Sequence, residues 1–214
     1  DGGIEAVRLD RTGAAVGAPF AVSPTGDAIT PRVATTSGGD LVVVWTDFTS
    51  DGGDTSGTSI QARWFAPDGT PLSDRWQVNT TTAGDQAYPD LATSGDRIAI
   101  VWHSPSSSGS DQSGSSIQLR VVAADGAWVG DEAQVNTHTP LDQTYPDVAL
   151  GGNGDLVVTW QSQTSGGDDA DGNSVQARRL PFVGPPGDEV QVNTYTAGDQ
   201  VRPAVGIMDG GAFE

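Results

Sequence analysis

A repeat of 57 residues constrains the fold of this chain more than any other feature. The tetrapeptide Gln-Val-Asn-Thr begins at Gln77, Gln134 and Gln191, and both intervals are 57 residues. The same step, within one residue, separates further landmarks, which are Asp85-Gln86, Asp142-Gln143 and Asp199-Gln200, then Pro89, Pro146 and Pro203, and also Trp45, Trp102 and Trp160. A fixed period of this length predicts a series of equivalent structural units.

Each unit is predicted to contain four β-strands. In one copy, residues 90–93 follow a proline and precede a tight turn at Gly95-Asp96. The next segment, residues 97–102, is rich in β-branched and aromatic residues, which predicts a buried strand. A polar stretch precedes residues 116–121, which alternate between apolar and polar, and a fourth strand is expected around residues 133–136. No helix is predicted, because 29 glycines and 13 prolines interrupt the chain and no segment has apolar residues at helical spacing.

The repeat predicts an all-β fold, a β-propeller built from four four-stranded units of about 57 residues. A single antiparallel sheet cannot bury both faces, so consecutive copies must pack face to face. We expect one domain over residues 1–214, with units at approximately 1–30, 31–88, 89–145 and 146–202. Residues 203–214 would begin a blade shared with the N-terminus, which closes a four-bladed ring. A longer array, or self-association of two chains through the incomplete terminal blade, is the alternative.

Four sequence motifs together resemble a known repeat. They are Val-Val-Val-Trp at residues 42–45, Ile-Gln-Ala-Arg at residues 60–63, and the Gln-Val-Asn-Thr and Asp-Gln motifs above. The set resembles a β-propeller repeat of large secreted bacterial proteins, often found beside haemolysin-type calcium-binding modules, and the strand order resembles NHL-type blades. The likeness covers nearly the whole chain and is strong in three of the four copies. It implies a secreted or cell-surface location and carries no established catalytic residues.

The charge of the chain limits its partners. The 28 acidic residues outnumber 10 basic ones, all of them arginine, for a formal net charge of −18. Such a surface repels phosphate backbones and anionic lipids, so we expect no nucleic-acid partner and no membrane insertion. Cations, glycans or a cell-surface partner suit it better. The absence of cysteine excludes disulfides, thiolate metal sites and a thiol nucleophile.

One loop has the spacing of a calcium site. Asp169, Asp171 and Asn173 place oxygen ligands at the first, third and fifth positions of a loop, next to Gly172. Calcium is therefore the candidate cofactor at these residues. The rest of an EF-hand loop is missing, and the equivalent loops of the other copies lack the pattern, so a solvated Asp-Gly loop is the competing interpretation.

A second candidate site is a ring of repeated polar residues that could bind sugar hydroxyls or a cation. Its members are Asp85, Gln86, Asp142, Gln143, Asp199 and Gln200. Their recurrence in each copy also fits a structural role, in which the aspartate accepts hydrogen bonds from nearby backbone N–H groups. Among the tryptophans, the three at the ends of apolar strands are expected in the core, whereas Trp128 follows the Asp125-Gly126 turn and is the best candidate for an exposed, ligand-binding aromatic ring.

Nothing in the sequence singles out a catalytic residue. The histidines, His103 and His138, occupy non-equivalent positions and belong to no metal or triad motif. The Ser-x-Asp-x-Gly-x-x-Trp motif of sialidases is absent, and no carboxylate pair stands out among many. We therefore expect a non-enzymatic, secreted module with a structural, adhesive or binding role, and calcium is the candidate ion that would stabilise it. The alternatives are a glycan-binding propeller lectin and a propeller glycosidase or lyase.

Overall fold

The fold of the chain consists of β-strands and loops. The computed structural model describes residues 3–23, 27–49, 53–181, 183–208 and 213, and this part of the chain contains no helix and hence none that could span a membrane. Its strands form three four-stranded antiparallel sheets and one two-stranded sheet. The predicted all-β propeller architecture is thereby confirmed.

The sheets follow one another along the sequence. The N-terminal sheet contains β1 (Glu5–Ala6) and β2 (Phe20–Ala21). The next sheet contains β3 (Ala28–Thr35), β4 (Leu41–Asp47), β5 (Ser59–Phe65) and β6 (Trp76–Gln77). The third contains β7 (Ala87–Ser94), β8 (Arg97–Ser104), β9 (Ser116–Ala123) and β10 (Ala133–Gln134). The last contains β11 (Gln143–Leu150), β12 (Leu156–Ser162), β13 (Ser174–Leu180) and β14 (Glu189–Gln191).

Alternating side chains on β4 and on β8 fill the core on both sides of their sheets. On β8, Ile98, Ile100 and Trp102 face the sheet that contains β4, while Ala99 and Val101 pack with residues of β11 and β12. A strand buried on both faces has the continuous apolar composition that the sequence shows. The three tryptophans expected in the core are fully buried, as predicted, and they are Trp45, Trp102 and Trp160.

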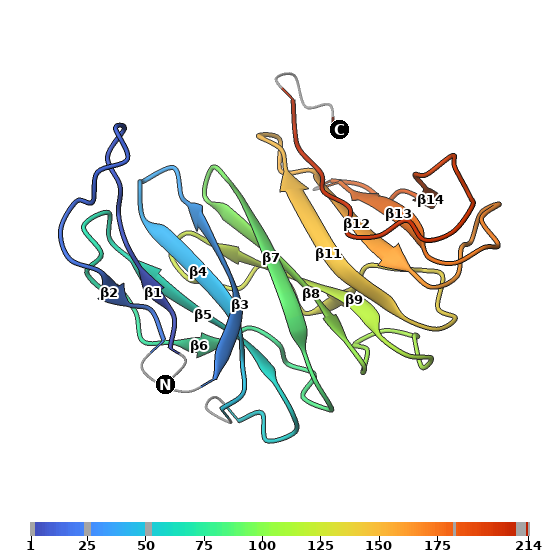
Figure 1. Ribbon diagram of the computed structural model, residues 1–214, viewed down its shortest axis with the longest axis horizontal. Helices are drawn as coiled ribbons and strands as arrows, with labels where there is room; N and C mark the ends of the chain where they lie inside the picture. Colours follow the sequence, from blue (N-terminus) through green and yellow to red (C-terminus); the bar gives the residue numbers. More distant parts are fainter. Residues whose placement is uncertain (1–2, 24–26, 50–52, 182, 209–212, 214) are drawn as a thin grey trace.

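The first strand of each sheet lies next to the first strand of the neighbouring sheet. Strand β7 contacts β3 on one side and β11 on the other, and Figure 1 shows these three strands side by side along the row. We call β3, β7 and β11 the inner strands. Each of them contains a shift in register, between Ile29 and Arg32, Ala87 and Asp90, and Thr144 and Asp147.

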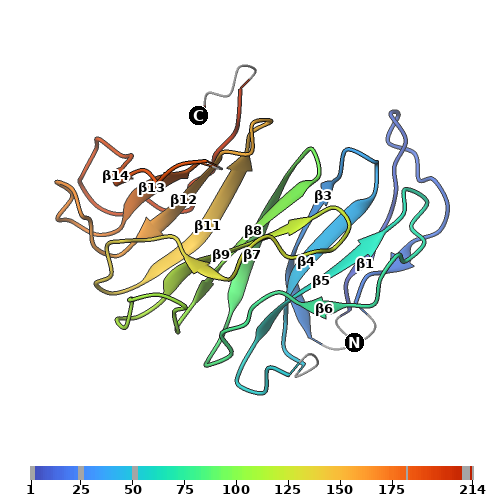
Figure 2. The same cartoon turned by 180° about the vertical axis from the view of Figure 1, so that it is seen from behind.

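The sheets stand in an open row. The β1–β2 sheet lies at one end and the β11–β14 sheet at the other, in both views of the chain (Figures 1 and 2). In the described ranges, β1 and β2 pair with each other alone, and the C-terminal bridge joins Ile207 to Phe213 of the same segment. The closing strand expected over residues 211–214 lies outside the described residues apart from Phe213. No strand pairing between the two ends is therefore recorded in the described part of the chain.

Candidate active site

The three residues predicted to bind calcium form hydrogen bonds with other protein groups. Asp169 Oδ2 accepts a hydrogen bond of 2.7 Å from Asn193 Nδ2, and Asp171 Oδ2 accepts one of 3.2 Å from the Gly198 N–H. Asn173 Nδ2 donates to Asp199 Oδ1 at 2.7 Å. Among residues whose positions the structure gives, no cluster of three or more His, Cys, Asp or Glu side chains could hold a metal. Calcium binding at this loop stays a prediction.

Asp169 belongs to a polar cluster that recurs in all three large sheets, buried in the first two and half-buried at Asn193 and Gln200 in the last. In the middle copy, Asn136 Nδ2 donates to Asp111 Oδ2 at 2.8 Å and to Gln143 Oε1 at 3.1 Å, while Asn136 Oδ1 accepts from the Ile117 N–H at 2.9 Å. We call this cluster the asparagine clamp. Its asparagine, aspartate and glutamine are Asn79, Asp54 and Gln86 in one copy, Asn136, Asp111 and Gln143 in the next, and Asn193, Asp169 and Gln200 in the last.

The repeated Asp-Gln pairs form part of this framework. Their aspartates accept hydrogen bonds from backbone N–H groups of the loop before the third strand, and the pairs are Asp85 with Thr58 at 3.0 Å, Asp142 with Ser115 at 2.8 Å and Asp199 with Asn173 at 2.9 Å. Their glutamines complete the asparagine clamps. Gln86 and Gln143 are fully buried. The hydrogen bonds accordingly give these residues the structural role, and their proposed role in ligand binding stays a prediction.

A different feature recurs on the inner strands. One residue in each copy, immediately before a proline, has a positive φ of 50° to 53°, and these residues are Thr30, Tyr88, Tyr145 and Arg202. Only a few per cent of non-glycine residues adopt this region, and the steric conflict before a proline adds to the cost. Strained residues of this kind cluster at functional sites, and bulges there redirect side chains. The inner strands are therefore the candidate location of a functional site.

All four strained residues line one cavity of about 250 Å³, together with Arg32 and Asp147. The rings of Tyr88 and Tyr145 meet edge to face, with centroids 4.7 Å apart, and the Arg202 guanidinium lies 5.1 Å from the Tyr145 ring. The hydrogen bond with Tyr145 raises the pKa of Tyr88. We call this set the inner-strand site.

Two carboxyl groups directly follow the prolines of β7 and β11, and one of them, Asp147, lines the cavity. The other, Asp90, is an ion-pair partner of Arg32, with 3.5 Å between Arg32 Nε and Asp90 Oδ1. Burial raises the pKa of Asp90 to about 6, and the neighbouring Asp147 carboxylate adds to the shift. Like charges held close together resist joint ionisation, so the pair retains a proton into the weakly acidic range.

The two carboxylates also fix the spacing of the inner strands. Asp90 Oδ2 accepts a hydrogen bond of 3.0 Å from the Val148 N–H, and Asp147 Oδ2 accepts one of 2.7 Å from the Val205 N–H. One oxygen of Asp90 is thus held by β11, and one oxygen of Asp147 is held by the C-terminal segment at Val205. This arrangement orients the carboxyl groups and leaves each with a further oxygen for a second partner.

The ring of His103 packs against the rings of Tyr88 and Tyr145. Its ring centroid lies 5.1 Å from that of Tyr88 and 6.1 Å from that of Tyr145. Burial lowers the pKa of His103 to about 4, so the ring is neutral at neutral pH. His138, by contrast, hydrogen-bonds to Thr164 at 2.9 Å and lies outside the inner-strand site.

Trp128, the predicted exposed aromatic residue, retains 36% of its surface exposed. It lies with Trp64 and Trp76 in a separate groove of about 400 Å³. Trp64 stacks on Trp76 with centroids 5.1 Å apart, and Trp76 meets Trp128 edge to face at 5.0 Å. The Arg120 guanidinium lies 3.3 Å from the centroid of the Trp128 ring, which fixes the ring by a cation–π contact.

Sequence reasoning missed the inner-strand site, although a signal was present. The tripeptide Tyr-Pro-Asp occurs at residues 88–90 and again at residues 145–147, whereas the equivalent positions read Thr30-Pro31-Arg32 and Arg202-Pro203-Ala204. The repeated proline draws attention to what the copies share. The site joins the tyrosine and aspartate side chains that two copies share to Thr30, Arg32 and Arg202 from the other two copies.

Comparison with known proteins finds likeness in structure but not in sequence. No family profile and no curated protein matches the chain. Trypanosoma rangeli sialidase in complex with the inhibitor DANA superposes with a TM-score of 0.55 and 13% identity, over 96% of this chain and 36% of the sialidase. An α-L-arabinofuranosidase from Lactobacillus brevis gives 0.49 and 14%, over 78% and 59%, and a thermostable family-43 glycoside hydrolase gives 0.47 and 14%, over 93% and 73%. This chain therefore spans about a third of the sialidase and three fifths of the arabinofuranosidase.

These comparisons correct the prediction that the chain is not an enzyme. Trypanosoma rangeli sialidase, whose TM-score exceeds 0.5, shares the fold of this chain and is an enzyme. At these identities the likeness establishes the fold, and this fold carries enzymes. The likeness shows the fold alone, so any chemistry depends on the residues of the inner-strand site.

Proposed function

We propose that this chain forms the catalytic part of a glycoside hydrolase, with the inner-strand site as its centre. The observation that carries the proposal is the pair Asp90 and Asp147, two carboxyl groups on neighbouring inner strands, one of which has its pKa raised to about 6. Glycoside hydrolysis needs one carboxylic acid that protonates the leaving oxygen and one carboxylate that activates water or attacks the sugar. A pair that retains one proton in weak acid supplies both.

The surrounding residues suit a sugar substrate. The aromatic faces of Tyr88 and Tyr145 can pack against the apolar face of a sugar ring, and Tyr88 is 37% exposed. Arg32 and Arg202 line the same cavity and offer N–H donors to sugar hydroxyl or carboxylate groups. The secreted location that the resemblance implies is compatible with an extracellular glycan substrate.

The test is hydrolysis of a panel of fluorogenic arabinosides, xylosides and sialosides at pH 5, with the wild-type chain and with Asp147→Asn. Loss of a positioned acid or base reduces the rate by about 10² to 10⁴-fold, so we expect a loss of that size in kcat/KM. The matched control is Asp96→Asn, which removes the same charge from a side chain that is 87% exposed. If no substrate is cleaved, or if Asp147→Asn matches Asp96→Asn, the proposal is wrong.

A second candidate function is glycan binding at the groove of Trp64, Trp76 and Trp128. The observation that favours it is an exposed tryptophan ring held in place by Arg120, beside two further tryptophans and two aspartates, Asp40 and Asp125, that line the same groove. A fixed aromatic face flanked by hydrogen-bond acceptors matches the two sides of a sugar ring. We propose that this groove holds a glycan segment apart from the site of cleavage.

A further inference from the structure

The β1–β2 sheet is half of a blade. Ile4 of this sheet takes the place of Ile60 and Ile117, because its N–H donates to Ser23 Oγ at 2.8 Å where those residues donate to the clamp asparagines. Strands β1 and β2 thus correspond to the third and fourth strands of the complete sheets. In a complete sheet, β5 pairs with β4 along seven residues, from Ser59 to Phe65. The corresponding edge of β1 has no strand partner among the described residues.

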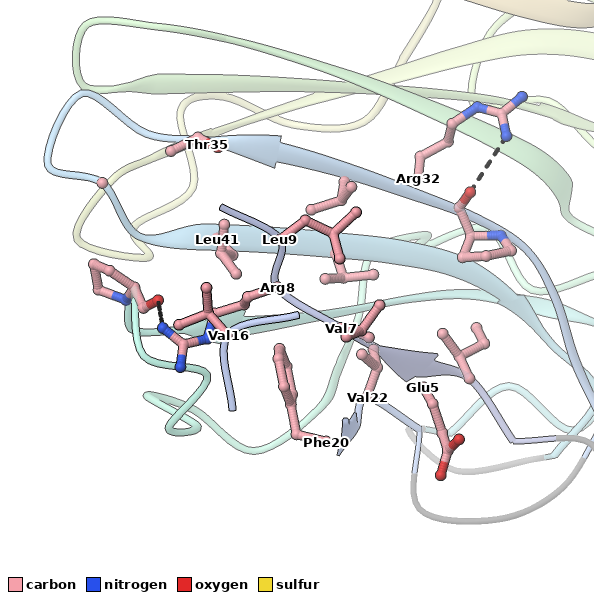
Figure 3. Close-up of a pocket in the computed structure, with 17 residues that line it drawn as sticks. Glu5, Val7, Arg8, Leu9, Val16, Phe20, Val22, Arg32, Thr35 and Leu41 are labelled. Carbon is pink, nitrogen blue, oxygen red and sulfur yellow. Dashed lines mark hydrogen bonds between the residues drawn. The ribbon is translucent and has the colours of Figure 1, made fainter. Parts of the chain in front are cut away.

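A groove occupies the place of the two absent strands. Its volume is about 650 Å³, and it lies between β1 and the strands β3 and β4, as Figure 3 shows. Its lining is mainly apolar, and three of the valine and leucine side chains in it are at least half exposed, namely Val7 at 50%, Leu9 at 61% and Val33 at 62%. We call it the half-blade groove.

Val33 shows what the groove lacks. Its equivalents on the next two inner strands, Leu91 and Val148, are 8% and 5% exposed, because the preceding sheet covers them. Val33 occupies the same register on β3, opposite Val43, as Leu91 does on β7, opposite Ile100. Leu91 and Val148 are covered by strands of the preceding sheet, whereas no described strand covers Val33 from that side.

The complementary half-blade is carried by the C-terminal segment of the chain. The bridge between Ile207 and Phe213 repeats the pairing of Leu150 with Leu156, which is the first hairpin of a complete sheet. The bond from the Val205 N–H to Asp147 repeats the bond from Val148 to Asp90, so the segment lies against β11 as an inner strand. Residues 202–208 and Phe213 therefore take positions of the first two strands of a blade.

We propose that the half-blade groove binds the C-terminal segment, through residues 202–208 and Phe213, of a second copy of this chain. The two half-blades of one molecule stand at opposite ends of the row (Figures 1 and 2), whereas two molecules placed head to tail bring them together. Strand addition at the free edge of β1 supplies backbone hydrogen bonds, and the added inner strand covers Val33. The contact is heterologous, so it builds either a closed ring or an extended filament.

The test is sedimentation velocity of the wild-type chain from 1 to about 200 μM, together with two single variants. Val33→Asp places a charge in the groove, and Phe213→Asp places one in the C-terminal segment. The wild-type chain should assemble with concentration, whereas each variant alone should remain a monomer. An equimolar mixture of the variants should form dimers and stop there, because one intact groove and one intact segment remain.

The controls separate assembly from folding. Val183→Asp introduces the same charge at a valine that is 82% exposed and lies outside the groove, and it should assemble like the wild type. Unchanged melting temperatures of the monomeric variants verify that they fold. A wild-type chain that remains monomeric at 200 μM, or variants that assemble as it does, would overturn the inference. So would a Leu9→Cys, Phe213→Cys double variant that forms its disulfide within one chain.

Discussion

The asparagine clamps and the inner-strand site are both built from repeated positions, but they treat repetition in opposite ways. Each clamp uses the same three residue types in all three large sheets, with the same hydrogen bonds. The inner strands repeat an unusual backbone conformation and then place Thr30, Tyr88, Tyr145 and Arg202 on it. The clamp is therefore filled identically in every large sheet, whereas the inner-strand site joins the Tyr and Asp side chains of two copies to different residues, Thr30 and Arg202, of the other two.

The largest expected effect on stability comes from a clamp. Asn136→Ala removes the donor to Asp111 and Gln143 and the acceptor for the Ile117 N–H, all in the interior. Buried groups left without partners cost about 1 to 3 kcal/mol each, so we expect a loss of about 3 kcal/mol in the free energy of unfolding, measured by urea denaturation.

The milder replacement Asn136→Ser tests the same interpretation. Serine stands naturally at the equivalent position of the half-blade, where Ser23 accepts from the Ile4 N–H. It should retain that one hydrogen bond and cost less than alanine. Equal losses for serine and alanine would show that the backbone bond to Ile117 contributes little.

The free energy of unfolding should depend on pH through Asp90, which belongs to the carboxyl pair of the inner strands. Because the pKa of Asp90 lies near 6 in the folded chain and near 3.8 when unfolded, the folded state binds this proton more tightly. Its contribution to the free energy of unfolding is therefore full below about pH 4 and is lost as the pH rises to about 6, by about 2 to 3 kcal/mol.

Asp90→Asn should remove this contribution to the pH dependence, and Asp96→Asn should leave it unchanged. Urea unfolding of the three proteins at pH 4 and pH 7 measures the difference. The same difference between pH 4 and pH 7 in Asp90→Asn as in the wild type would show that this carboxyl group is not the one that holds the proton.

The sequence predicts the repeated part of the molecule well, and the reason is physical. Residues 98–102 are apolar on both faces of their strand, so the sheet that contains them must be covered on both sides, and face-to-face packing follows. The inner-strand site depends instead on which side chains converge when neighbouring strands are 57 residues apart. Pro89 and Pro146 mark the bulge, but the approach of Asp90 to Asp147 depends on the lateral spacing of β7 and β11, which no local pattern encodes.

The terminal half-blade was harder to predict for a similar reason. Matching the start of the chain to the third strand of a repeat identifies which strands are present. Whether Val33 is covered depends on the curvature of the row, which arises from the packing of every interface together.

Replacement of Trp128, at another position where the repeats differ, should have a smaller effect, and this effect is on glycan affinity. Its bridge to Val122 corresponds to that between Phe65 and Pro71 and to that between Leu9 and Ala15, so only one copy carries an aromatic ring there. Trp128→Ala should weaken glycan binding by about tenfold, or about 1.4 kcal/mol, measured by calorimetry with the best ligand from a glycan array. Pro71→Ala is the matched control at the equivalent position. Equal affinities for both variants would remove the tryptophan groove from the account.

The smallest expected effect on stability separates strain from function. Tyr88→Gly relieves a φ of 53°, a gain of about 1 kcal/mol, but loses the ring contact with Tyr145, a cost of similar size. We expect a change in the free energy of unfolding below about 0.5 kcal/mol, with a marked loss of hydrolysis. A large destabilisation would mean that the tyrosine serves the fold.

The most direct test of the central claim is a crystal structure of the chain with a glycan soaked into it. If the inner strands carry the function, the sugar will lie at the inner-strand site, against Tyr88 and Tyr145 and within hydrogen-bonding distance of Asp147. A sugar bound in equivalent positions at Asp85, Asp142 and Asp199, with the inner-strand site empty, would contradict the account.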